Sequence, residues 1–153
     1  MFLFGIGVFF AGLLLFQLIN ANWEPAVFTA FLDASTILAF AVAVTAVIII
    51  TGNAGVFASA VKSLFSKKHT LSDVELHNAI DLFKLLRRTV VCAAVLFVSV
   101  SVIIMMGSLF DTDAALANLA LTLLIVFYAA IINLIFINPV ITILQKRHHN
   151  EGL

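Results

Sequence analysis

Ionisable side chains inside long apolar runs are the first residues to inspect for chemistry, because a charge is costly there and is kept where it has a function. The sequence has four long apolar runs, and no Asp, Glu, Lys or Arg lies in the middle of any of them. The nearest is Asp33, directly before the run that begins at Ala34. Because Asp is a preferred helix cap, we interpret Asp33 as a cap or boundary residue, with a proton carrier as the alternative.

Uncharged polar side chains are the remaining candidates for a functional site. Ser99 and Ser101 lie in the third apolar run. The fourth run places a polar stripe on one helical face, at about 100° per residue: Asn118, Thr122, Ala129 and Asn133, with Ile125 on the same face. Such groups either line a wet path or form interhelical hydrogen bonds worth about 1 kcal/mol or less. We interpret each single residue as a packing residue and the whole stripe as the functional candidate.

Residue patterns for enzymatic chemistry are missing from the sequence. There is no glycine-rich phosphate loop, no nucleophile–base pair and no paired carboxylates, so we expect neither an enzyme nor a bound cofactor. The one cysteine, Cys92, lies in an apolar run, and no Cys/His grouping has the spacing of a zinc site. The histidines (His69, His77, His148 and His149) are interpreted as solvated polar residues, with metal binding as the alternative.

Composition indicates that lipid rather than water surrounds most of the chain. Of 153 residues, 63% are hydrophobic and 10% are charged, and the mean hydropathy is +1.21. A soluble domain has about a quarter charged residues. We expect one all-α transmembrane domain, residues 1–153, with long second and fourth helices. The expected spans are 2–19, 34–58, 89–109 and 114–144, with a cytoplasmic connection at 62–88.

The charge distribution predicts the orientation of this domain. All eight basic residues fall in the connection between the second and third spans or in the C-terminal tail: Lys62, Lys67, Lys68, Lys84, Arg87, Arg88, Lys146 and Arg147. The other two connections hold only acids. By the positive-inside rule the basic side is cytoplasmic, so both termini are expected there. The lysines are expected to meet anionic lipid headgroups, and the zero net charge does not indicate a nucleic-acid partner.

Two of the expected helices extend beyond the bilayer. The segment from Ser72 to Arg88 has a cap-like start and apolar residues at helical spacing, so it predicts an amphipathic helix that continues into the third span. In the second span, Gly52 and Gly55 weaken the helix without needing to end it. The fourth helix is longer than a bilayer requires. We therefore expect its last turns, beyond Asn138 and Pro139, to project into water or to kink.

Two stretches resemble the MotA/TolQ/ExbB family of stator and energy-transducing proteins. Residues 31–52, FLDASTILAFAVAVTAVIIITG, resemble the entry to the second helix of MotA. Residues 115–147 resemble the last helix of the family, in which an aromatic–Tyr–small step is followed by a proline some three turns later; Tyr128 and Pro139 fit that spacing. The order of loops fits as well.

The resemblance implies a membrane subunit that assembles with copies of itself. Family members form rings, here expected to be pentameric, in the bacterial inner membrane. The ring surrounds the single-span helices of a second protein, whose intramembrane Asp or Glu carries protons. In this chain the residues implied to line the ion path are Ser99, Ser101, Asn118 and Thr122.

The sequence also departs from the family pattern. Ile125 and Val126 stand where the family has a threonine, about one turn before the tyrosine, and the third helix lacks the usual glycine and proline. The connection at 62–88 is too short for a rotor-contacting domain. The alternative hypothesis is therefore a structural homo-oligomeric membrane protein with the stator fold and no ion conduction.

Overall fold

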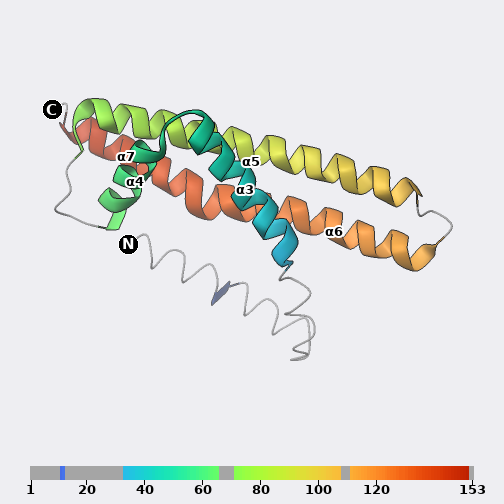
Figure 1. Cartoon of the computed structure of the whole chain (residues 1–153). Coiled ribbons are helices and arrows are strands. Elements are labelled where there is room, and N and C mark those ends of the chain that lie inside the picture. Colours follow the sequence, from blue (N-terminus) through green and yellow to red (C-terminus); the bar gives the residue numbers. More distant parts are fainter. Residues whose placement is uncertain (1–10, 13–32, 66–70, 108–110, 152–153) are drawn as a thin grey trace.

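The computed structural model describes residues 11–12, 33–65, 71–107 and 111–151, and every element within these ranges is a helix (Figure 1). The expected first span, 2–19, lies outside the described residues apart from 11–12. The helices with full bounds are α3 (Ala34–Ile50), α4 (Ala54–Phe65), α5 (Asp73–Gly107), α6 (Thr112–Ile131), η1 (Ile132–Ile137) and α7 (Asn138–Glu151). The expected all-α class is confirmed for this part of the chain.

Helix α5 is one continuous helix of 35 residues that joins the amphipathic segment to the third expected span. Its start is a capping box, in which the Ser72 backbone N–H donates to Glu75 Oε2 (2.9 Å) and the Glu75 N–H donates to Ser72 Oγ (3.4 Å). Four apolar residues at helical spacing in its first half are buried: Leu76, Ile80, Phe83 and Leu86. The predicted amphipathic helix that runs into the third span is therefore confirmed.

The fourth expected span is also continuous, from Thr112 to His149 over 38 residues. Asp111 caps its start by accepting hydrogen bonds from the backbone N–H groups of Asp113 and Ala114. The expected disturbance at Asn138 and Pro139 takes the form of η1, a π-helical turn in which the Asn138 N–H donates to Asn133 O, five residues back. Proline has no N–H and its ring crowds the carbonyl of residue i−4, and the wider turn accommodates both.

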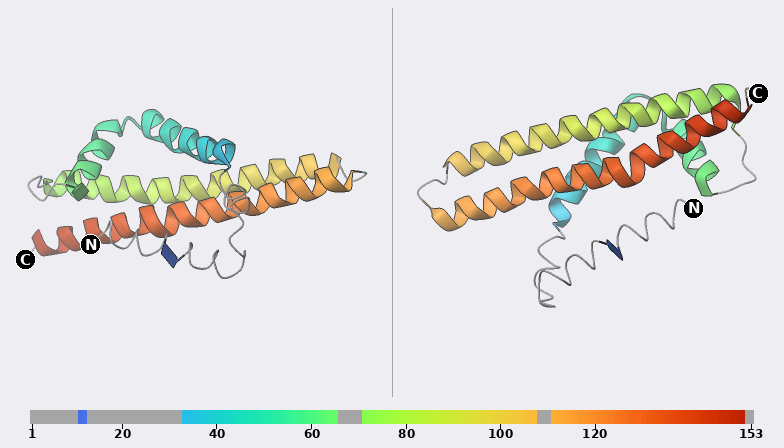
Figure 2. Two further views of the ribbon diagram at one scale, coloured as in Figure 1. Left: turned by 90° about the horizontal axis from the view of Figure 1, so that it is seen from below. Right: turned by 180° about the vertical axis from the view of Figure 1, so that it is seen from behind.

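Helices α5 and α6–η1–α7 lie side by side and antiparallel, and we call this pair the hairpin (Figure 2). Both members are long and apolar enough to cross a membrane, and within the described residues they are the only single helices of which this is true. In their most apolar stretches only 22% and 28% of the residues are buried by the chain itself. Most of the hairpin surface therefore depends on lipid or on other helices for cover.

The second expected span is interrupted in the structure. Helix α3 ends with Thr51 as its C-cap, Gly52 has φ +67, and α4 leaves at 117° to α3. The expectation of one helix over 34–58 is thus wrong in its continuity, because Gly52 adopts the left-handed conformation that typically ends a helix. Helix α3 crosses the hairpin obliquely (Figures 1 and 2). The α3–α4 pair is a broken span or a re-entrant segment.

Aromatic contacts hold the broken pair against α5. The Phe40 ring of α3, which is 1% exposed, meets the Phe97 ring edge to face, with centroids 5.3 Å apart. The Phe57 ring of α4 stacks on Phe83, with centroids 5.9 Å apart. Such pairs contribute about 0.5–1.5 kcal/mol beyond the burial of their area.

Candidate functional site

Three of the four residues expected to line an ion path meet inside the hairpin. Ser101 of α5 is 3% exposed, and its Oγ lies 2.7 Å from Thr122 Oγ1 and 3.2 Å from the backbone carbonyl oxygen of Asn118. Thr122 Oγ1 donates to the same carbonyl at 2.8 Å. We call Ser101, Asn118 and Thr122 the hydroxyl cluster. Its hydroxyl groups are satisfied by each other and by one carbonyl, as apolar surroundings require.

Ser99 does not belong to the hydroxyl cluster. Its side chain is exposed, and its Oγ donates to the Val95 carbonyl oxygen one turn earlier in the same helix, at 2.8 Å. Two residues along a helix turn the side chain by about 200°, so Ser99 and Ser101 point to opposite sides of α5. Of the four expected lining residues, Ser99 is therefore the exposed one, whereas Asn118 and Thr122 are half-buried.

Asp33 is the N-cap of α3. Its carboxylate accepts hydrogen bonds from the Ser35 N–H (3.1 Å), the Ser35 hydroxyl (2.6 Å), the Thr36 N–H (3.3 Å) and the Thr36 hydroxyl. Its own N–H donates to the Tyr128 hydroxyl oxygen at 3.0 Å. Tyr128 lies about 24 Å along the helix axis from Thr112, at 1.5 Å per residue, so Asp33 is level with an inner part of the hairpin rather than with its outer end.

The remaining stripe residues lie in α6 and η1, and two of them, Ile125 and Ala129, belong to the buried core. Ile125 and Ala129 are 4% and 8% exposed, and Asn133 Nδ2 donates to the Ala129 carbonyl oxygen at 3.0 Å. Within the described residues, two buried side-chain oxygens have no hydrogen-bond partner: Asn133 Oδ1 and Asn138 Oδ1. Asn133 lies within the π-helical turn, and Asn138 follows it directly. The Asn133 side chain therefore donates one hydrogen bond within the chain, and its oxygen can still accept one from a donor.

Sequence reasoning missed two features of this region. In the sequence, Tyr128 is singled out only by its place in the family pattern. In the structure its hydroxyl accepts a hydrogen bond from the Asp33 N–H and so connects α6 to the start of α3. The sequence marks Asn138 only as the point beyond which the last turns project into water or kink, whereas in the structure its side-chain oxygen is buried. The signal for Asn138 was the following Pro139, because a proline inside a helix disturbs the preceding turn.

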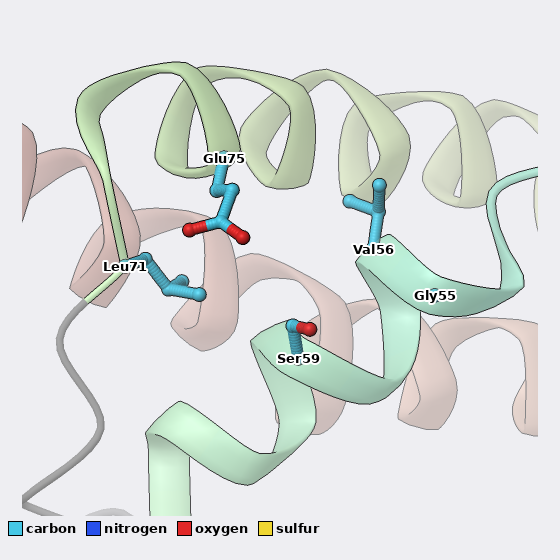
Figure 3. A pocket seen from close by; sticks show the side chains of 5 residues that line it. All are labelled: Gly55, Val56, Ser59, Leu71 and Glu75. Atoms are coloured by element: carbon cyan, nitrogen blue, oxygen red, sulfur yellow. The ribbon is translucent and has the colours of Figure 1, made fainter.

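The basic end of the molecule holds a second set of polar contacts. Arg147 Nη1 of α7 donates to the Ser63 carbonyl oxygen near the end of α4, at 3.2 Å. A cavity of about 240 Å³ lies between α4 and the start of α5 (Figure 3), lined by Gly55, Val56, Ser59, Leu71 and Glu75. Because the Glu75 carboxylate accepts from Ser72 in the capping box, we assign it to the helix start. In the described ranges, no three His, Cys, Asp or Glu side chains are grouped to hold a metal ion.

No protein-family model, curated protein or solved structure matches this chain. The part of the chain that the structure describes is all-helical, and two of its helices are long and apolar enough to cross a membrane.

Proposed function

We propose that this chain is the ring-forming subunit of an ion-motive-force-driven complex of the MotA/TolQ/ExbB kind. In this proposal it crosses the bacterial inner membrane four times with both termini in the cytoplasm. Five copies surround a partner's single transmembrane helix, which supplies the proton-carrying Asp or Glu.

The observation that carries the proposal is the contact between Asp33 and Tyr128. These residues belong to the two separate stretches that resemble the family, residues 31–52 and 115–147. The Asp33 N–H donates to the Tyr128 hydroxyl oxygen at 3.0 Å across 95 positions of sequence. Asp33 and Tyr128 are among the residues that carry the resemblance of the two stretches. A contact between them is expected if both stretches belong to the fold of that family.

Two further observations support a subunit that needs other helices. Much of the hairpin surface is uncovered by the chain itself, and large apolar side chains project from both members, such as Ile103, Met106 and Leu123. In addition, α5 beyond Arg88 and α6 beyond Asp113 contain no Asp, Glu, Lys, Arg or His. A proton path along the hairpin would therefore need an acid from another chain.

A structural map of the complex purified from native membranes tests this proposal. We expect five copies of the chain around a helix that is not its own, with Ser99 nearer the centre than the hydroxyl cluster. A closed assembly with lipid at its centre, or an assembly of another symmetry with no foreign helix, would contradict the proposal.

The hydroxyl cluster favours a second candidate function, a structural homo-oligomer with the stator fold and no ion conduction. Ser101 and Thr122 bond to one another inside the hairpin, which is the arrangement of packing residues rather than of a wet path. Proton flux into vesicles reconstituted with the native complex separates the two functions. Flux that falls in Thr122→Val while the oligomer stays intact supports conduction, and the absence of flux in the unmodified complex supports the structural function.

A further inference from the structure

His77 and His148 are far apart in the sequence, yet their rings lie close together at the basic end of the hairpin. His77 lies in the second turn of α5 and His148 lies near the end of α7, and the ring centroids are 6.3 Å apart at an interplanar angle of 50°. Both residues are exposed, so the pair is accessible to a solute from the aqueous side. The contact requires the first turns of α5 to remain packed against the last turns of α7.

The packing beneath the two histidines fixes the helices that carry them. Leu76, the neighbour of His77, is 1% exposed, and Leu144, one turn before His148, is fully buried. Ile80 and Ile141 are buried in the same core. Because the rings stand on two helices held by this apolar core, the two Cα positions are fixed while the exposed side chains can still rotate.

We propose that His77 and His148 form a two-imidazole binding site for a divalent transition-metal ion, with water completing the coordination. Neutral imidazole is the commonest protein ligand for such ions. A metal ion bonds to an imidazole nitrogen at about 2.1 Å, which places the centres of two bound rings about 5–6 Å apart. The separation of 6.3 Å reaches this value by a small side-chain rotation.

Asp81 acts as a positioning residue for this site. Its Oδ2 lies 3.4 Å from His77 Nε2, one turn along α5, and its Oδ1 lies 3.1 Å from Lys84 Nζ. A carboxylate beside one ring nitrogen favours the proton on that nitrogen and leaves the other nitrogen free to bind a metal. Lys84 pairs with the Asp81 carboxylate and partly offsets its charge. The carboxylate therefore attracts the metal ion less, and the two imidazoles remain the ligands.

The bound ion would join the amphipathic start of α5 to the last helix, on the side that carries the basic residues. This assignment is independent of the proposed function, because it depends only on the packing of α5 against α7. It also distinguishes His148 from its neighbour His149, which is turned by about 100° on the same helix.

Cu²⁺ titration of the full-length chain, purified without a polyhistidine tag and held in lipid nanodiscs, tests the proposal. Cu²⁺ is the probe because it binds nitrogen ligands most tightly among the first-row divalent ions. We expect electron paramagnetic resonance to show two nitrogen ligands in the unmodified chain. His77→Gln and His148→Gln should each weaken binding by at least about tenfold because one imidazole no longer chelates, and Asp81→Asn by up to about tenfold.

His149→Gln is the matched control and should bind as the unmodified chain does. Binding that is lost in His149→Gln and kept in His77→Gln would assign the metal to the adjacent tail histidines and overturn the proposal. Absence of Cu²⁺ binding by the unmodified chain at micromolar concentration would overturn it as well. A variant that loses α-helical circular dichroism is replaced by His77→Asn or His148→Asn, for which the same outcomes apply.

Discussion

At the scale of single residues, the two serines of α5 show how burial decides the role of a hydroxyl. Ser101 is almost fully buried and bonds across the hairpin to Thr122, whereas Ser99 is exposed and bonds to its own helix. The sequence offers both as equal candidates, because hydropathy does not reveal which face of α5 meets α6. The structure therefore separates one structural serine from one accessible serine.

Ser101→Ala should lower the free energy of unfolding by about 1 kcal/mol, since it removes a buried interhelical hydrogen bond. Ser99→Ala is the control and should change it by less than about 0.5 kcal/mol, as exposed substitutions do. Steric trapping in bilayers measures both. A double-mutant cycle of Ser101→Ala with Thr122→Val should give a coupling of about 0.6 kcal/mol, and a coupling of zero would show that the two hydroxyls do not interact.

Tyr128→Phe should destabilise the packing of α3 on α6 by about 1 kcal/mol, because the Asp33 N–H loses its acceptor. Phe127→Leu in the same turn changes apolar area and leaves that acceptor in place. Hydrogen exchange at the start of α3 measures the effect directly. Faster exchange of the Asp33 amide in Tyr128→Phe alone is expected, and equal exchange in both variants would contradict the hydrogen bond.

At the scale of the helices, Gly52 and Gly55 have similar surroundings and different conformations. A Cβ added at either position would meet no heavy atom within 4 Å, yet only Gly52 has a positive φ, +67. Sequence reasoning treated both as tolerated helix glycines. It could not find the break, because helix propensity does not report which glycine adopts the left-handed conformation.

Gly52→Ala should destabilise the chain by about 1 kcal/mol, since an L-residue with a side chain is strained at this φ. Gly55→Ala should stabilise it by about 0.5 kcal/mol, since alanine restricts the unfolded chain and suits a helix. Thermal unfolding of the two variants in one detergent gives the comparison. If Gly52→Ala were as stable as Gly55→Ala, α3 and α4 would form one helix.

At the scale of the whole molecule, the sequence predicts the extent of the two long helices better than the contacts between helices. The amphipathic start of α5 and its run into the third span follow from spacing and from the serine cap. The contacts Ser101–Thr122, Asp33–Tyr128 and His77–His148 depend on the register between helices, which one-dimensional patterns do not contain. Because this register is not contained in the sequence pattern, the pattern does not reveal the histidine pair, whose members are 71 positions apart.

The expected topology places Asp111 outside the cell and His149 in the cytoplasm, which makes a two-sided labelling experiment decisive. In a Cys92→Ser background, Asp111→Cys should react with an impermeant maleimide from the outer face only. His149→Cys should react from the cytoplasmic face only. Labelling of both cysteines from the same face would contradict the orientation inferred from the segregated basic residues.

The π-helical turn has a consequence for the phase of the last helix. In a uniform α-helix, Leu144 would point about 100° away from Ile125, because nineteen residues do not make whole turns. The wider turn absorbs one residue, so Ile125 and Leu144 are both buried, and Ile137 rather than Phe136 faces inward. The turn at residues 132–137 therefore has the effect of one extra residue. It keeps the buried face of α6 and the buried face of α7 on the same side of the helix. Removing one residue there would rotate the basic tail, and His148 with it, away from α5.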